Sequence, residues 1–92
     1  MNATHPGRIL KRELIARELS ANQLALALSV PSGRIVDILN GKRAITADTA
    51  LRLGLYFNNS PQFWMNLQSQ YELALASNEY GEAIKNEVRL SA

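Results

Sequence analysis

The polar residues of segment 32–40 are the part of this sequence best suited to contact another molecule. Arg34 can donate two parallel hydrogen bonds to O6 and N7 of guanine, and Ser32 can pair with several base edges. Gly33 allows close backbone approach, and Asp37 can accept a hydrogen bond from the amine of cytosine. The expected base contacts in a DNA groove are therefore Ser32, Gly33, Arg34 and Asp37.

Four polar or basic residues flank these positions and suit phosphate oxygens. Contacts to phosphate fix the position of a protein on a duplex without reading its sequence. The expected phosphate contacts are Gln23, Asn40, Lys42 and Arg43. For Lys42 and Arg43 an ordinary solvated turn remains the alternative interpretation.

The distribution of charge favours a polyanionic partner for the first half of the chain. Residues 1–52 carry eight lysines and arginines against four acidic residues, whereas residues 53–92 carry two against four. A basic stretch attracts nucleic acid, and the acidic second half needs another role. Ordinary solvated surface is the alternative explanation of both halves.

Helix ends are visible on the N-terminal side of the base-contacting segment. Pro6 fits the first turn of a helix that we expect to reach about Glu18. Ser20 and Gln23 form a capping box that begins a second helix, and Pro31 interrupts that helix because proline disfavours helical geometry in the preceding residue. The apolar stripe of the first helix consists of Ile9, Leu10, Leu14 and Ile15.

Further helix ends follow the base-contacting segment. Gly41 is expected as the left-handed stop of a third helix, and Thr46 caps a fourth that runs to about Phe57. Ser60 followed by Pro61 begins a fifth and longest helix, to about Ala76. The charged and apolar residues from 79 to 90 indicate either a sixth, weaker helix or a loose tail.

The second and third helices have the features of a helix-turn-helix. A small residue, Ala25, stands where two such helices cross, and apolar residues lock them together. No segment alternates with a period of two, so no sheet is expected. We predict an all-α fold, a compact five-helix bundle with a central helix-turn-helix, with a DNA-binding domain over 1–78 and a C-terminal helical or flexible tail over 79–92. A corner that serves only packing is the alternative.

The fifth helix is the expected site of dimerisation. One helix-turn-helix makes few contacts, and two-fold symmetry lets a pair read half-sites about 34 Å apart. Apolar and aromatic residues recur every three or four positions along this helix. We expect Trp64 in the core and Leu67, Tyr71 and Leu75 in the dimer interface.

Several classes of function lack the residues that they need. The chain has no cysteine and one histidine, so we expect no metal site and no cofactor, and no catalytic constellation is recognisable. No apolar run is long enough to cross a membrane, and the first residues do not form a secretion signal. We expect a cytoplasmic protein that is not an enzyme.

Specific sequence blocks resemble a known family. Segment 21–42 resembles the helix-turn-helix of Cro/C1-type phage repressors, of the λ-repressor-like fold. Segment 5–75 resembles the HigA family of antitoxins through His-Pro-Gly at 5–7, Asn-Gly-Lys-Arg at 40–43, Ile-Thr-Ala-Asp-Thr-Ala-Leu-Arg-Leu at 45–53, and Ser-Pro-Gln-Phe-Trp at 60–64 followed by Asn-Leu-Gln at 66–68.

The resemblance implies two activities in one molecule. A HigA-like antitoxin binds operator DNA as a dimer to repress its own operon, and it neutralises a HigB-type ribonuclease toxin by direct binding. A stand-alone phage-type transcriptional regulator without a toxin partner is the alternative. Two positions depart from the repressor pattern: Ser29 stands where the turn often has glycine, and Ala21 stands where glutamine often contacts phosphate.

Overall fold

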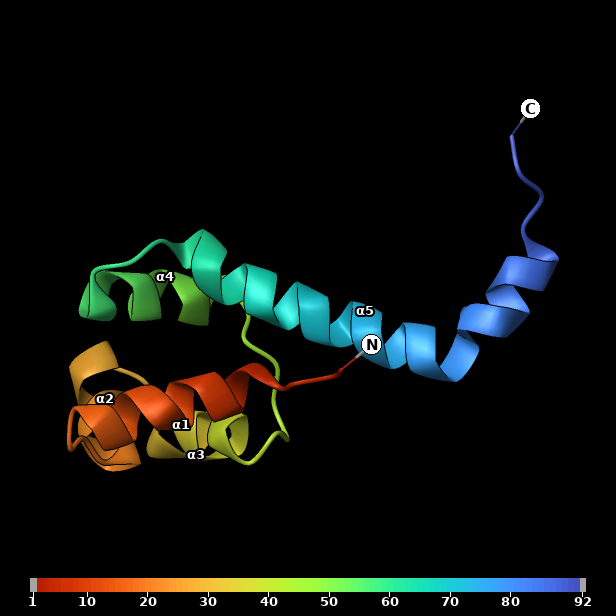
Figure 1. Cartoon of the computed structure of the whole chain (residues 1–92). Helices are drawn as coiled ribbons and strands as arrows, with labels where there is room; N and C mark the ends of the chain where they lie inside the picture. The colour runs from red at the N-terminus through yellow and green to blue at the C-terminus, as the bar shows by residue number, and fades with distance from the viewer. Residues whose placement is uncertain (1, 92) are drawn as a thin grey trace.

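The computed structural model describes residues 2–91, and these residues form five α-helices without a strand. The expectation of an all-α, five-helix architecture is confirmed. The helices are α1 (Pro6–Ala16), α2 (Ala21–Leu28), α3 (Ser32–Leu39), α4 (Ala47–Phe57) and α5 (Pro61–Glu87) (Figure 1). Residues 1 and 92, the outer ends of the two predicted segments 1–78 and 79–92, lie outside the described range. Between residues 2 and 91 no helix combines the length and apolar character needed to cross a membrane.

Most helices begin where a side chain satisfies a free backbone N–H group. Ser20 Oγ accepts from the backbone N–H of Gln23 at 3.1 Å, and Gln23 Oε1 accepts from the N–H of Ser20 at 2.9 Å, so the predicted capping box is present. Thr46 and Ser60 cap α4 and α5 in the predicted way. These local contacts explain why α2, α4 and α5 start where the sequence indicates.

A left-handed residue follows the end of each helix from α1 to α4. Gly41 has a φ of 73°, and its neighbour Lys42 donates its backbone N–H to the carbonyl of Asp37 at 2.8 Å, which closes α3 as predicted. Asn58 ends α4 with a φ of 56°. Helix α1 ends at Ala16 rather than near Glu18, because Glu18 itself is left-handed, with a φ of 53°. The prediction for the end of α1 was therefore too long.

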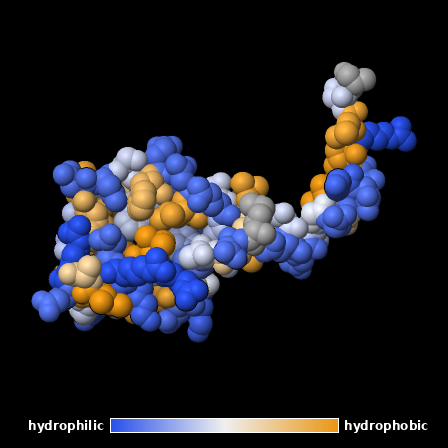
Figure 2. All heavy atoms as spheres, in the orientation of Figure 1, coloured by the Kyte–Doolittle hydropathy of each residue, from blue (hydrophilic) through white to orange (hydrophobic). Residues whose placement is uncertain are grey.

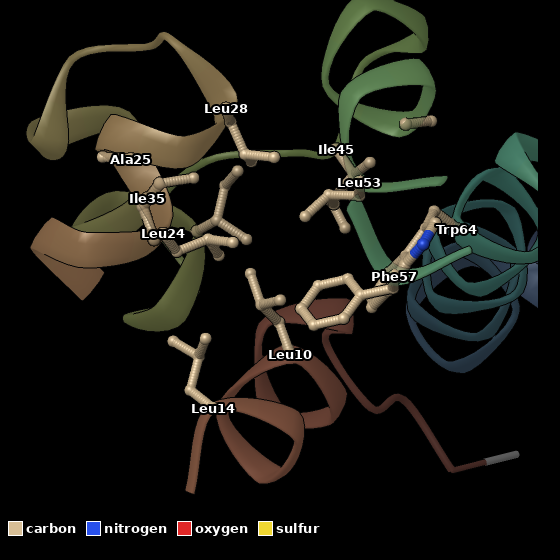
Figure 3. Close-up of a cluster of buried hydrophobic side chains, with 12 residues drawn as sticks. Leu10, Leu14, Leu24, Ala25, Leu28, Ile35, Ile45, Leu53, Phe57 and Trp64 are labelled. Carbon is tan, nitrogen blue, oxygen red and sulfur yellow. The ribbon is translucent and has the colours of Figure 1, made fainter. Parts of the chain in front are cut away.

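A single apolar core joins all five helices. Leu10 of α1, Leu24 of α2, Ile35 of α3, Leu53 of α4 and Trp64 of α5 are fully buried members of this one cluster (Figure 3). The indole N–H of Trp64 donates to Asn59 Oδ1 at 2.9 Å, so its one polar atom is satisfied. The prediction that Trp64 belongs to the core is confirmed, whereas Ile15, expected on the inner face of α1, is 68 % exposed.

Helix α5 is longer than the sequence indicated. It continues without a break to Glu87, over 27 residues, instead of ending near Ala76 and giving way to a separate element. Its C-terminal part projects away from the other helices, and apolar side chains lie exposed along it (Figures 1 and 2). Exposed apolar residues of this part include Leu73, Tyr80 and Ile84.

Candidate nucleic-acid interface

The corner between α2 and α3 places α3 at the surface. Ala25 is only 2 % exposed at the contact of the two helices, and its carbonyl accepts from the backbone N–H of Val30 at 3.0 Å. Ser29 takes the left-handed conformation, with a φ of 57° and a ψ of 46°. The turn thus keeps its shape without glycine, at a strain of about 1–2 kcal/mol for a residue with a Cβ.

One face of α3 is open to solvent. Ile35 and Ile38 are fully buried, and this fixes the opposite side of the helix outward. Three of the four expected base-contacting residues, Ser32, Gly33 and Asp37, are exposed there. Nothing lies within 4 Å of the position that a Cβ at Gly33 would occupy, so a ligand could approach its backbone closely.

The open face also includes Val36, which sequence reasoning missed. Val36 is 41 % exposed although it is apolar, and it lies between Ser32 and Asn40 on the helix. An apolar side chain at such a place can contact the methyl group of thymine. The signal in the sequence was its position four residues after Ser32, on the face opposite Ile38.

Arg34 lies at the edge of the open face rather than on it. Its side chain is 29 % exposed, and Nη1 donates to Asp48 Oδ1 on α4 at 3.1 Å. The same carboxylate oxygen accepts from Arg52 Nε at 2.8 Å, and Arg52 Nη1 donates to the carbonyl of Leu28 at 2.8 Å. The hydrogen bond from Arg52, and then the bond and charge of Arg34, hold the pKa of Asp48 below its usual value, so Asp48 stays ionised.

The basic loop after α3, residues 42–45, is exposed except at its last residue, which is hydrogen-bonded to α5. Lys42 and Arg43 are solvent-exposed, as phosphate contacts would require. The backbone N–H of Ile45 donates to Oε1 of the buried Gln68 at 2.9 Å. Since Gln68 belongs to α5, the loop is attached to the helix that carries the core tryptophan.

His5 connects the same loop to two helices. Its Nδ1 accepts from the backbone N–H of Gly7 at 2.9 Å and so caps α1, and its ring meets that of Tyr71 edge to face at 4.8 Å. Burial lowers the pKa of His5 below its usual value, and a hydrogen bond with the backbone of Arg43 opposes this shift. His5 therefore has a structural role, since it contacts α1, α5 and the loop. The sequence analysis did not indicate this role.

The expected phosphate contacts form two groups. Asn40, Lys42 and Arg43 follow one another at the end of α3 and in the loop, all exposed. Gln23 lies apart, in the first turn of α2, where its carbonyl oxygen serves the capping box. Its amide nitrogen is the part of the side chain left for a phosphate.

The expected dimer residues have three different environments. Leu67 packs against the core, and Tyr71 is half-buried beside His5. Leu75 is 43 % exposed, which leaves it open to a second molecule. Of the three, Leu75 is the residue whose surroundings leave most apolar surface uncovered.

Acidic and histidine side chains are scattered. Within residues 2–91 no three of them come close enough to hold a metal ion.

Polar side chains of α3, the following loop and the start of α4 lie close together. A shallow cavity of about 170 Å³ between them is lined by Arg34, Arg43, Ala44, Thr46, Asp48 and Thr49.

Known proteins share both the sequence pattern and the fold. The Helix-turn-helix family matches residues 10–64. Virulence-associated protein I of Dichelobacter nodosus is 48 % identical over 80 residues, which cover 86 % of this chain and 74 % of the relative. The structure of an addiction module antidote protein of the HigA family from Coxiella burnetii is 48 % identical, with a TM-score of 0.96, over 99 % of this chain and 100 % of that one.

A second solved structure connects this fold with DNA. The Pseudomonas aeruginosa antitoxin HigA, solved with the higBA promoter, is 44 % identical and superposes with a TM-score of 0.94, over 99 % of this chain and 100 % of that one. The agreement extends over α5 as well as over the helix-turn-helix. The chain therefore belongs to the HigA family of Cro/C1-type helix-turn-helix proteins.

Proposed function

We propose that this protein is an antitoxin that binds operator DNA and represses its own operon. The observation that carries the proposal is the open face of α3, with the basic loop at its C-terminal end, in a fold that matches an antitoxin solved with promoter DNA. Ser32, Gly33, Arg34 and Asp37 are the proposed base contacts, and Gln23, Asn40, Lys42 and Arg43 the proposed phosphate contacts. A repressor of its own operon acts on DNA inside the cell, so the proposed location is the cytoplasm, and the proposed function needs no catalytic group.

A pair of arginine and lysine substitutions tests this assignment. Arg34→Ala should weaken binding to the preferred sequence by about 1–3 kcal/mol and relax the preference at one base position. Lys42→Ala should weaken binding to all DNA alike and flatten the salt dependence by about one unit of slope. The preferred sequence is selected by the wild-type protein from a random duplex library, and affinities are then measured by mobility shift over a series of salt concentrations.

Each outcome has a defined meaning for the interface. Unchanged sequence preference in Arg34→Ala would show that α3 does not read bases through this arginine. An unchanged salt slope in Lys42→Ala would reassign Lys42 to ordinary surface. Failure of the wild-type protein to select any sequence would refute the repressor function.

The protein is further proposed to bind its operator as a homodimer through α5. Leu75 is the best test position because it is exposed and its replacement leaves the core intact. Leu75→Glu should convert the dimer to a monomer in analytical ultracentrifugation and weaken operator binding. Leu73→Glu, on a different side of α5 and 62 % exposed, is the matched control and should remain dimeric. Two equally dimeric variants would contradict the proposed interface of Leu67, Tyr71 and Leu75.

The last component of the proposal is direct neutralisation of a HigB-type ribonuclease toxin. Residues 53–92 carry an excess of acidic residues, which suits a basic partner. Co-expression with the product of an adjacent small reading frame should give co-purification of the two proteins and restore growth. Arg34→Ala should still restore growth, since toxin binding does not require base contacts. Absence of binding to the neighbouring product would favour the stand-alone regulator.

A further inference from the structure

We propose that Asp48 is a positioning residue for sequence reading, which holds the guanidinium of Arg34 in place to meet a base edge. The inference rests on the proposed DNA-binding function and deepens it. Asp48 lies on α4, outside the helix that is proposed to enter the groove, and affects sequence preference through Arg34.

The position of Arg34 is determined by bonds that connect three helices. Asp48 Oδ1 accepts from Arg34 Nη1 at 3.1 Å and from Arg52 Nε at 2.8 Å. Arg52 is itself fixed, since its Nη1 donates to the carbonyl of Leu28 at the end of α2 at 2.8 Å. The carboxylate that orients Arg34 is therefore held against the helix-turn-helix and cannot swing freely.

The bond to Asp48 leaves Arg34 able to pair with a base. A guanidinium has five N–H donors in a planar fork, and Asp48 occupies one of them. The side chain keeps 29 % of its surface exposed, and the cavity of about 170 Å³ beside it leaves room for an approaching group. An arginine that is already ordered loses less conformational entropy when it binds guanine with two hydrogen bonds.

The charge of Asp48 makes the proposal distinguishable from simple electrostatics. The side chain is 60 % exposed beside the proposed DNA contacts, where a carboxylate repels phosphate. From charge alone, its removal should strengthen binding to every sequence. If Asp48 positions Arg34, its removal should instead weaken binding to the preferred sequence, because Arg34 then samples several orientations.

The experiment compares Asp48→Ala and Asp48→Asn with the wild-type protein in selection from a random 20-base-pair library. The variants should bind non-selected duplex as well as the wild type or a few-fold better, while preference for the selected sequence falls roughly tenfold, within the discrimination of one bidentate arginine–guanine pair. The loss should appear at the base position that Arg34→Ala relaxes. Glu13→Gln removes one negative charge from an ion pair on α1 and should leave preference unchanged.

The double variant Arg34→Ala/Asp48→Ala decides whether the two residues act together. If Asp48 works through Arg34, the double variant should show no lower preference than Arg34→Ala alone. Thermal unfolding without DNA identifies any variant whose fold is weakened, and Asp48→Asn keeps the shape of the side chain if Asp48→Ala unfolds. Unchanged preference in both Asp48 variants, or an additive loss in the double variant, would overturn the inference while leaving the repressor function intact. A wild-type protein without preference would overturn both.

Discussion

Replacement of Gly7 by alanine is expected to destabilise the fold by about 3 kcal/mol, at the upper end of the effect of overpacking. A Cβ at Gly7 would collide with the carbonyl oxygen of Ile38, where α1 crosses α3. A backbone carbonyl cannot move aside like a flexible side chain, so the two helices would have to separate. Because α3 carries the open face, operator binding should decline together with stability. Urea unfolding followed by Trp64 fluorescence measures the effect.

Gly33→Ala is the matched control for this prediction. Gly33 is also helical, but its Cβ would meet no atom within 4 Å. Alanine there should stabilise α3 by about 0.5–1 kcal/mol, because glycine is the poorer helix former. Equal effects of the two substitutions would show that the crossing of α1 and α3 is less close than described.

Local sequence signals were sufficient for most helix ends. The capping box of Ser20 and Gln23, and the caps Thr46 and Ser60, involve residues at most three positions apart, so they could be recognised without a fold. The left-handed stop at Gly41 is equally local. These elements place α3 at the surface, and so the open face was also predictable from the inward spacing of Ile35 and Ile38.

Contacts distant in sequence were not predictable. Arg34 and Asp48 are 14 positions apart, and Ile45 and Gln68 are 23 apart, so no periodicity connects them. The sequence accordingly placed Arg34 on the open face, whereas the ion pair draws it to the edge beside α4. The role of His5 likewise depends on Tyr71, which only the complete fold brings to it.

The end of α5 was missed for a different reason. An apolar stripe indicates a helix when one face packs on a core, and beyond Ala74 the α5 side chains are half-buried or exposed. Residues 79–90 therefore gave an ambiguous pattern, although α5 continues through them as far as Glu87. Tyr80 and Ile84 leave apolar surface exposed to solvent on that extension.

Trp64→Ala is expected to destabilise the protein by about 3–5 kcal/mol, a large share of the roughly 5–15 kcal/mol available to a domain of this size. Trp64 is fully buried, and its ring lies 5.8 Å from that of Phe57 and 5.1 Å from that of Phe63. Its removal leaves a cavity between α4 and α5. Since the substitution removes the only tryptophan, circular dichroism or calorimetry must follow unfolding.

Trp64→Phe separates the packing of the ring from its hydrogen bond. Phenylalanine keeps an aromatic ring against Phe57 but cannot donate to Asn59, whose side chain can turn to solvent because the residue is exposed. It should therefore destabilise the fold less than Trp64→Ala.

Gln68 lies one turn along α5 and holds the basic loop through Ile45, so loosening of α5 in Trp64→Ala should also release the segment that carries Lys42 and Arg43. If Trp64→Ala keeps full operator affinity at a temperature where it stays folded, α5 does not position that loop.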